Sequence, residues 1–453
     1  MALSTVFSLD KILKEFYAGP IRDQLNNEML VFELFNRRKM NWVGRRVIMP
    51  VRVSRNNSGA FAPDNGALPP AGQQGYADLT IPSKYLYGRM SITGPAIAQA
   101  KASVGAFVNG LQQELDGAVE TVKNAADLAC FTGGGAVGFV NDRAAAASTM
   151  PFSGNLEGLP GSAAPGIPCV VVRNDTYAVI AAGAAGALFV RQSATAGSAQ
   201  FVTNLGAGNN LDLTGLAKGA AATVVILALD AALAFPTENQ ALGIYGNLGA
   251  GYFDAAVLAG AAPTHFGADR TTATGSTVLQ STIQSVENTV ASAAPGAGAR
   301  TPVDTKRMQG ILDSIADQSG ESPDCMIAHY IFRQEYTSLM SFTSEAAAVG
   351  IATSRSKSVD SGDPGFNMGA LSFNGIPLKV ARQCGKGLLI FLNLKSWVVA
   401  EVQAPGMADL DGSVLSREAG ADAYEAFVRY YYNTVCTAPN RNGILTGISY
   451  AGV

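Results

Sequence analysis

A long turn-rich segment, flanked by strand-like sequence and followed by a long helical pattern, most constrains the fold of this 453-residue chain. Residues 46–53 include β-branched residues and alternate with period two, which predicts a strand with two different faces. Pro50 lies inside this run and cannot donate to a ladder, so the strand belongs at an edge or in a two-stranded ribbon. Residues 54–78 are rich in Gly, Pro and Asn and predict a long tip, and residues 79–93 predict a returning strand.

The predicted hairpin over residues 46–92 needs support from outside itself. An isolated two-stranded hairpin is barely stable in water. We therefore expect a neighbouring subunit to hold it.

The segment after the hairpin predicts one long helix. Residues 93–95 read Thr-Gly-Pro, and proline is favoured in the first turn of a helix. Apolar residues over 97–126 recur at steps of seven, three and four, which places them on one helical face. A helix continuing to about Ala129 would be roughly 45–50 Å long, and the glycines at 133–135 end it.

The N-terminal 45 residues predict an arm and not a domain. Residues 8–17 have the spacing of an amphipathic helix with Ser8 as its N-cap, and residues 21–35 carry a second apolar face. These segments are too short to build a core of their own, so we expect the arm to lie on another surface.

The centre of the chain is rich in Ala and Gly and low in charge, and it predicts a small β-rich module at about 165–230. The sequence beyond it predicts both helices and strands. The expected helices lie at 276–294, 305–318 and 330–340, and the expected strands at 325–328, 371–373, 376–380, 388–392, 397–402, 423–435 and 443–448. Asn374-Gly375 is a typical hairpin turn between two of these strands.

No residue pattern predicts catalysis, a cofactor or a metal. Residues 133–138 formally match GxGxxG, but they follow a helix where the nucleotide motif follows a strand, so a helix-ending turn is expected. His265 and His329 are the only histidines, and neither has ligands at metal-binding spacing. We expect both to be structural or solvated.

Two clusters near the C-terminus were weighed as sites. An acidic group comprises Asp409, Asp411, Glu418, Asp422 and Glu425. It lacks the remaining ligands of a calcium loop, so a solvated turn followed by a charged inter-subunit surface is expected. Tyr430 and Tyr432 share one face of a strand, where core packing explains them better than base stacking does.

The composition favours a protein covered by other copies of itself. Only 15% of residues are charged and 48% are hydrophobic, which leaves few charges to cover a free surface. The net charge of −3 gives no basic footprint for nucleic acid. Five scattered cysteines form neither a disulfide framework nor a zinc motif, and we expect reduced, buried thiols. With no signal peptide and no apolar run of membrane-spanning length, a soluble cytoplasmic product is expected.

The order of these elements resembles the major capsid proteins of tailed phages with the Hong Kong-type shell fold. The resemblance is carried by residues 35–53, the strand-to-helix junction at Pro95, and residues 373–378, 392–393 and 424–447. It implies an α+β fold built from an N-terminal arm, an extended hairpin loop, a long spine helix, and peripheral and axial domains. The implied segments are the arm at 1–45, the hairpin at 46–92, the spine helix at 93–135, an axial domain with peripheral portions at 136–370, and a C-terminal sheet at 371–453.

The implied function is a structural subunit that self-assembles into an icosahedral shell around phage DNA. The hairpin would lie across an adjacent subunit within hexameric and pentameric capsomers, in a virion assembled in the host cytoplasm. Its implied partners are a portal, a possible decoration protein and a scaffolding protein, with only non-specific contact to DNA and none to a membrane. Because the arm begins close to Met1, the scaffold is expected to be a separate protein. Some members of the family link their loops covalently through lysine, but residues 54–78 contain none and Lys84 lies on the returning strand, so no such link is expected.

Three other functions compete with this one. An encapsulin-type nanocompartment shell would share the fold. A hydrolase using the acidic C-terminal group is the alternative from another class, although the group lacks a paired base. Another phage structural protein, such as a decoration or tail component, is disfavoured by the size of the chain and its long helix.

Overall fold

The structure is a computed structural model whose residues divide into two compact units. Described residues of the smaller unit lie within 86–124 and 404–430, and those of the larger within 29–85, 125–403 and 431–453. The structure describes residues 30–39, 46–56, 58–62, 64, 66–93, 110–140, 149–155, 159–163, 166–173, 179–180, 188–192, 198–202, 223–227, 239–249, 264–270, 277–285, 304–337, 371–407, 416–417, 420 and 422–448.

One sheet of five strands includes two long strands from the C-terminal part of the chain. Its order is β1 (Asn36–Lys39), β19 (Trp397–Met407), β21 (Ala423–Cys436) and β20 (Ser416–Arg417), with β4 (Lys84–Thr93) also paired to β21. β1 runs parallel to β19. The strands predicted at 397–402 and 423–435 are thus confirmed, and β19 is longer than predicted. The helix expected at 8–17 lies outside the described residues, whereas α2 (Leu30–Leu34) falls in the second expected arm segment.

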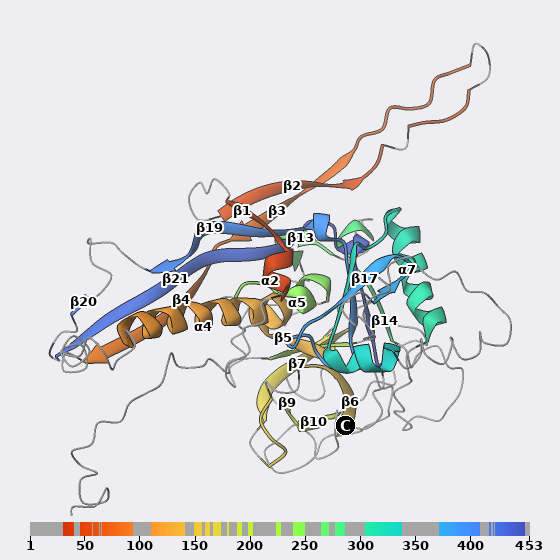
Figure 1. Ribbon diagram of the computed structural model, residues 1–453. Coiled ribbons are helices and arrows are strands. Elements are labelled where there is room, and N and C mark those ends of the chain that lie inside the picture. The colour runs from red at the N-terminus through yellow and green to blue at the C-terminus, as the bar shows by residue number, and fades with distance from the viewer. Residues whose placement is uncertain are drawn as a thin grey trace, which may run out of the picture. The chain divides into compact units, whose positions relative to one another are not determined.

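The extended hairpin is an antiparallel ribbon of β2 (Arg46–Ser54) and β3 (Gly75–Pro82), with its tip beyond them (Figure 1). The predicted first strand is confirmed. The return predicted over residues 79–93 is confirmed for residues 79–82 in β3 and wrong for residues 84–93, because the ladder with β2 stops at Pro82 and β4 pairs with β21. Proline has no N–H to continue a ladder, so Pro82 marks the change of sheet. The hairpin therefore spans residues 46–82.

The long helix is α4 (Gly110–Thr132), which at 23 residues is about 34 Å long. It confirms the later part of the predicted helix, whose expected start at 93–109 lies outside the described residues. A 3-10 turn, η1 (Gly133–Gly135), follows it, and Gly134 and Gly135 have φ of 80° and 84°. Only glycine adopts this left-handed conformation readily, so the glycine run ends the helix as predicted.

Seven short strands between residues 136 and 227 form a sheet that closes on itself. They are β5 (Ala136–Val140), β6 (Thr149–Gly154), β7 (Ile167–Arg173), β8 (Val179–Ile180), β9 (Phe189–Gln192), β10 (Ser198–Val202) and β11 (Thr223–Leu227). The order is β11-β5-β6-β10-β9-β7-β8, and β11 also pairs with β7, which closes six strands into a ring. Phe139, Phe152 and Phe201 have no exposed surface. The module is larger than the one predicted at 165–230, because it includes β5 and β6.

A six-stranded sheet and one helix enclose the main apolar core of the larger unit. The strand order is β14 (Thr282–Ser285), β22 (Gly443–Thr446), β18 (Leu389–Leu392), β15 (Cys325–Ala328), β17 (Ile376–Val380) and β16 (Ser372–Phe373). The helix α7 (Thr305–Ser319) lies beside these strands (Figure 1). Its Met308, Ile311 and Ile315 are buried in a core cluster that these strands share. Residues 330–337 are helical, as predicted.

The helix predicted over 276–294 is wrong in its described part. That part contains a 3-10 turn, η5 (Thr277–Leu279), and the strand β14, in which Ile283 lies opposite Ile444 of β22 in a parallel ladder. The apolar spacing of a short segment does not separate helix from strand, and here a partner far along the chain decided the outcome.

Candidate assembly surface

The β2–β3 ribbon has an inner and an outer face. On the inner face, Leu79 and Ile81 have no exposed surface. They share a cluster with Leu242, Phe266, Ala268, Leu279, Ala400 and Val435, against which Met49, Val51, Val53 and Ala77 also pack. The base of the hairpin is therefore held by its own subunit, and the expectation that a neighbour holds the whole hairpin is wrong for this part. On the outer face, Ile48 and Tyr76 are 60% and 65% exposed.

A small turn packs against the inner face of the ribbon and anchors it. It joins β12 (Thr264–His265) to β13 (Ala268–Asp269), and its Phe266 is buried within the ribbon's apolar cluster. The carbonyl oxygen of Phe266 accepts a hydrogen bond of 2.6 Å from the N–H of Thr80 in β3. Phe266 has φ of 51°, in the left-handed region that non-glycine residues rarely adopt. The surrounding packing holds this residue in that conformation.

Behind the turn lies a buried polar network centred on Arg270. Its guanidinium has no exposed surface and donates to the carbonyl oxygens of Leu279 (2.9 Å), Gly249 (2.9 Å) and Asn247 (2.5 Å). The Asn247 side chain in turn accepts from the N–H of Cys436 in β21. Buried polar groups rigidify a fold when their hydrogen bonds are made, so this network holds the anchor turn against the rest of the larger unit.

The hairpin tip, residues 56–74, combines local order with exposed apolar side chains. Asn56 joins the two sides of the hairpin, because its amide donates to the carbonyl oxygen of Gly72 at 2.9 Å. Its side-chain oxygen accepts from the N–H of Ser58 at 2.9 Å. Phe61 is fully exposed and Leu68 is 87% exposed. Exposed apolar side chains of this size on an extended loop are typical of a surface that meets another protein.

Positive charge concentrates in the sequence that leads into the ribbon and forms its first strand, although the whole chain is acidic. Seven of the chain's Lys and Arg residues lie between Arg37 and Arg55, and no acidic residue lies between Glu33 and Asp64. All four residues of β1 (Asn36–Lys39) are exposed. The guanidinium of Arg37 lies 4.3 Å from the centre of the Phe32 ring, a favourable cation–π distance.

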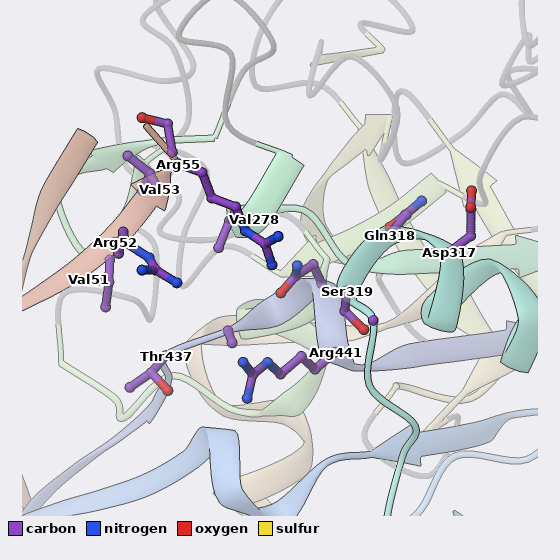
Figure 2. Close-up of a pocket in the computed structure, with 14 residues that line it drawn as sticks. Val51, Arg52, Val53, Arg55, Val278, Asp317, Gln318, Ser319, Thr437 and Arg441 are labelled. Carbon is purple, nitrogen blue, oxygen red and sulfur yellow. The ribbon is translucent and has the colours of Figure 1, made fainter. Parts of the chain in front are cut away.

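A cavity of about 670 Å³, here called the arginine cavity, lies in the larger unit beside the distal end of β2 and the C-terminal end of α7 (Figure 2). Its lining consists of Val51, Arg52, Val53, Ser54, Arg55, Val278, Asp317, Gln318, Ser319, Gly320, Thr437, Ala438, Asn440 and Arg441. Arg441 forms an ion pair of 2.9 Å with Glu321. The volume of the arginine cavity falls within the roughly 300–1,000 Å³ of typical ligand pockets.

The two histidines occupy hydrogen-bonded positions in the larger unit. The Nε2 of His265 donates to the carbonyl oxygen of Cys436 at 2.6 Å, and its Nδ1 has no hydrogen-bond partner among the described residues. Burial, and to a lesser extent the charge of the nearby Arg270, lowers the pKa of His265 to about 3. His329 accepts the N–H of Ile331 at 3.3 Å at the start of a helix. No group of three or more His, Cys, Asp or Glu side chains within the described ranges is arranged to hold a metal ion.

The other sequence candidates also take structural positions where they are described. Of the acidic group, Glu425 forms an ion pair with Arg89 of β4, while Asp409, Asp411 and Glu418 lie outside the described residues. Tyr430 and Tyr432 are buried, which confirms core packing. The five cysteines are free and buried. In the part of the chain that the structure describes, no helix is long and apolar enough to cross a membrane.

The sequence reasoning missed Arg270, the anchor turn and the arginine cavity. An isolated Arg in a Gly- and Ala-rich region carries no signal of burial, since arginine is rarely buried. The cavity joins residues near 52, 318 and 440, and no local pattern connects such distant positions. The seven Lys and Arg residues between Arg37 and Arg55 were visible in the sequence. Acidic residues elsewhere bring the net charge of the whole chain to −3, so the net charge does not show this local excess.

Comparison with solved structures identifies the architecture. A chain of the "Cyanophage A-1(L) capsid asymmetric unit" aligns with a TM-score of 0.52 and 11% identity, over 98% of this chain and 99% of that chain. The chain has the fold of a phage capsid subunit. The predicted Hong Kong-type α+β capsid fold is thereby confirmed.

Two other solved structures show weaker likeness. A chain from the "Capsid of native GTA particle" aligns with a TM-score of 0.48 and 9% identity, covering 99% of this chain and 100% of that one. A chain of Mycobacterium phage Bobi aligns with a TM-score of 0.46 and 11% identity, covering 98% and 99%. No family model and no curated protein matches the chain.

Proposed function

We propose that this chain is a structural major capsid protein that self-assembles into the icosahedral shell enclosing phage DNA. The observation that carries the proposal is the capsid fold, aligned over nearly the full length of both chains with the cyanophage subunit. The described structure adds an extended hairpin that its own subunit holds at the base, with exposed apolar side chains at its tip. These exposed side chains of the tip are available for contact with a neighbouring subunit.

The parts of the chain have the following proposed roles. The arm at 1–45 and the hairpin tip contact neighbouring subunits, the α4 region and the C-terminal sheet form the peripheral domain, and the central part supplies the axial domain. The proposed partners are copies of the same chain in hexamers and pentamers, a portal, a separate scaffolding protein and a decoration protein. Contact with packaged DNA is non-specific, because a chain with a net charge of −3 has no overall attraction for a polyanion. The proposed location is the capsid of the virion.

The alternatives gain no support from the described residues. A hydrolase acting through the C-terminal acidic group needs an available carboxylate, but Glu425 is paired with Arg89. An encapsulin-type shell shares the fold, and neighbouring genes distinguish it: terminase and portal genes accompany a capsid protein, and a cargo enzyme accompanies a compartment shell. A non-enzymatic, structural role fits the capsid fold best.

Electron microscopy of the purified protein tests the proposal. Negative stain should show closed icosahedral shells or capsomer rings, with or without a co-expressed scaffolding protein. A chain that stays monomeric under every condition would refute the shell function. The matched variant replaces residues 56–74 with a short Asn-Gly turn, which a two-stranded ribbon accommodates. It should keep the urea midpoint of the subunit and lose assembly, because the buried base of the ribbon is unchanged.

A further inference from the structure

We propose that the hairpin tip of one copy inserts into the arginine cavity of a neighbouring copy, with Asp64 of the tip facing the arginines. This inference rests on the proposed shell function and names the two surfaces that would meet. The charge of the cavity, its apolar wall and the composition of the tip support it.

The arginine cavity has a surplus of positive charge. Its lining holds three arginines and a single carboxylate, that of Asp317. Arg441 is already paired with Glu321, whereas neither Arg52 nor Arg55 forms an ion pair with another described residue. An arginine presents several N–H donors in a planar fork that matches a carboxylate. The cavity is therefore suited to an occupant that brings one negative charge.

The lining of the same cavity is also partly apolar, because it includes Val51, Val53 and Val278. A simple anion would leave these side chains uncovered. The cavity therefore favours a peptide that carries one carboxylate beside apolar side chains over a simple anion.

The hairpin tip has this composition. Asp64 is the only charged residue between Arg55 and Asp78. It lies between the exposed side chains of Phe61 and Leu68. These apolar groups can pack on the valines of the cavity wall, Val51, Val53 and Val278. Charge and apolar surface are complementary between the tip and the cavity.

The contact must form between two copies. Phe61 is fully exposed, so the tip does not occupy its own subunit's cavity. The tip and the cavity are different surfaces, and contacts between unlike surfaces of identical chains are heterologous. Repeated heterologous contacts close into rings when the rotation between copies allows it. Ring closure is the geometry that a capsomer needs.

Cross-linking between two single-cysteine variants tests the contact directly. Leu68→Cys on the tip is mixed with Ser319→Cys in the cavity, assembled, and treated with a short bismaleimide. The native cysteines are buried, so the reagent reacts with the new thiols. Asp313→Cys, on the exposed surface of α7 outside the cavity lining, replaces Ser319→Cys in the matched control. Because a bound interface gives millimolar effective concentration, linkage should exceed the control by roughly a hundredfold.

A charge exchange tests the electrostatic part of the contact. Asp64→Arg and Arg55→Asp should each reduce assembly on their own, since each places like charges at the interface. A chain carrying both changes should recover assembly, because an arginine on each tip then meets an aspartate in the neighbouring cavity. Circular dichroism of each single variant shows that its fold is intact. An unrelated Asp313→Arg change on α7 should leave assembly unchanged.

The outcomes separate the two proposals. Selective linkage to Ser319→Cys, as a dimer at twice the 46.8 kDa chain mass, supports insertion of the tip. Shells that form with equal linkage to both partners, or with none, would overturn the inference and leave the shell function standing. Failure of the double variant to assemble while both single variants fold would also overturn it. If no condition gives shells or rings, the proposed function itself fails.

Discussion

Leu79 and Ile48 lie on neighbouring rungs of the β2–β3 ribbon, Leu79 on its buried face and Ile48 on its exposed face. Substitutions at these two positions therefore separate support of the subunit's own core from contact with a neighbour. Leu79 has no exposed surface and packs in the subunit's own core, so Leu79→Ala should lower the free energy of unfolding by about 2–5 kcal/mol. Ile48 is 60% exposed on the outer face, and Ile48→Ala should change it by only about 0.5 kcal/mol. Against a typical total of about 5–15 kcal/mol, the first change is large and the second is small.

Urea unfolding of unassembled subunits, followed by circular dichroism, measures this difference. Leu79→Ala should shift the midpoint well below that of the parent chain, while Ile48→Ala should leave it nearly unchanged. Equal midpoints for the two variants would refute the reasoning, because the ribbon's base would then contribute nothing to the stability of the isolated subunit. In that case the hairpin would depend on neighbouring copies along its whole length.

Three further perturbations probe other parts of the larger unit and of α4. Burial raises the pKa of every cysteine thiol, to about 11 for Cys325 and further for the other four. Ellman's reagent should therefore label no thiol in the native subunit and five after denaturation. Rapid labelling of the native subunit would contradict the burial of these thiols. Because the pKa of His265 falls from 6.5 to about 3 on folding, the unfolded chain binds the proton first, and stability should fall as pH drops from 6.5 towards 3. Between pH 7.5 and 5 the loss should be about 2 kcal/mol, and urea midpoints of His265→Gln should lack this component. A Cβ on Gly133 would lie 2.1 Å from the Ala241 carbonyl oxygen, so Gly133→Ala should lower the thermal midpoint, whereas Gly117→Ala within α4, which meets nothing within 4 Å, should raise it slightly.

The sequence predicted elements well where local chemistry set their limits. The helix α7 begins after Asp304, whose side chain accepts from the N–H of Lys306 at 3.0 Å, and ends at Gly320 with φ of 71°. The turn at Asn374 and Gly375 has positive φ at both residues, as an Asn-Gly hairpin requires. Such signals lie within a few residues of the element they limit, so reading the sequence alone recovers them.

Prediction from the sequence failed where a pairing partner far along the chain decided the structure. The segment around Ile283 became a strand because β22, some 160 residues later, offered a parallel partner. Residues 84–93 left the hairpin because β21 was available to pair with β4. The arginine cavity also depends on residues far apart in sequence, and only the run of cations that includes Arg52 and Arg55 left a local trace. Long-range pairing of this kind has no local periodicity to announce it.

The closure of the central module fixes where the chain enters and leaves it. β5 opens the module and β11 ends it, and these two strands pair directly, with Ala136 opposite Ile226. The chain therefore leaves and re-enters the remaining fold at nearly one point, as inserted domains commonly do. The six ring strands pair with one another on both sides, so none of them offers a free edge to another copy of the chain.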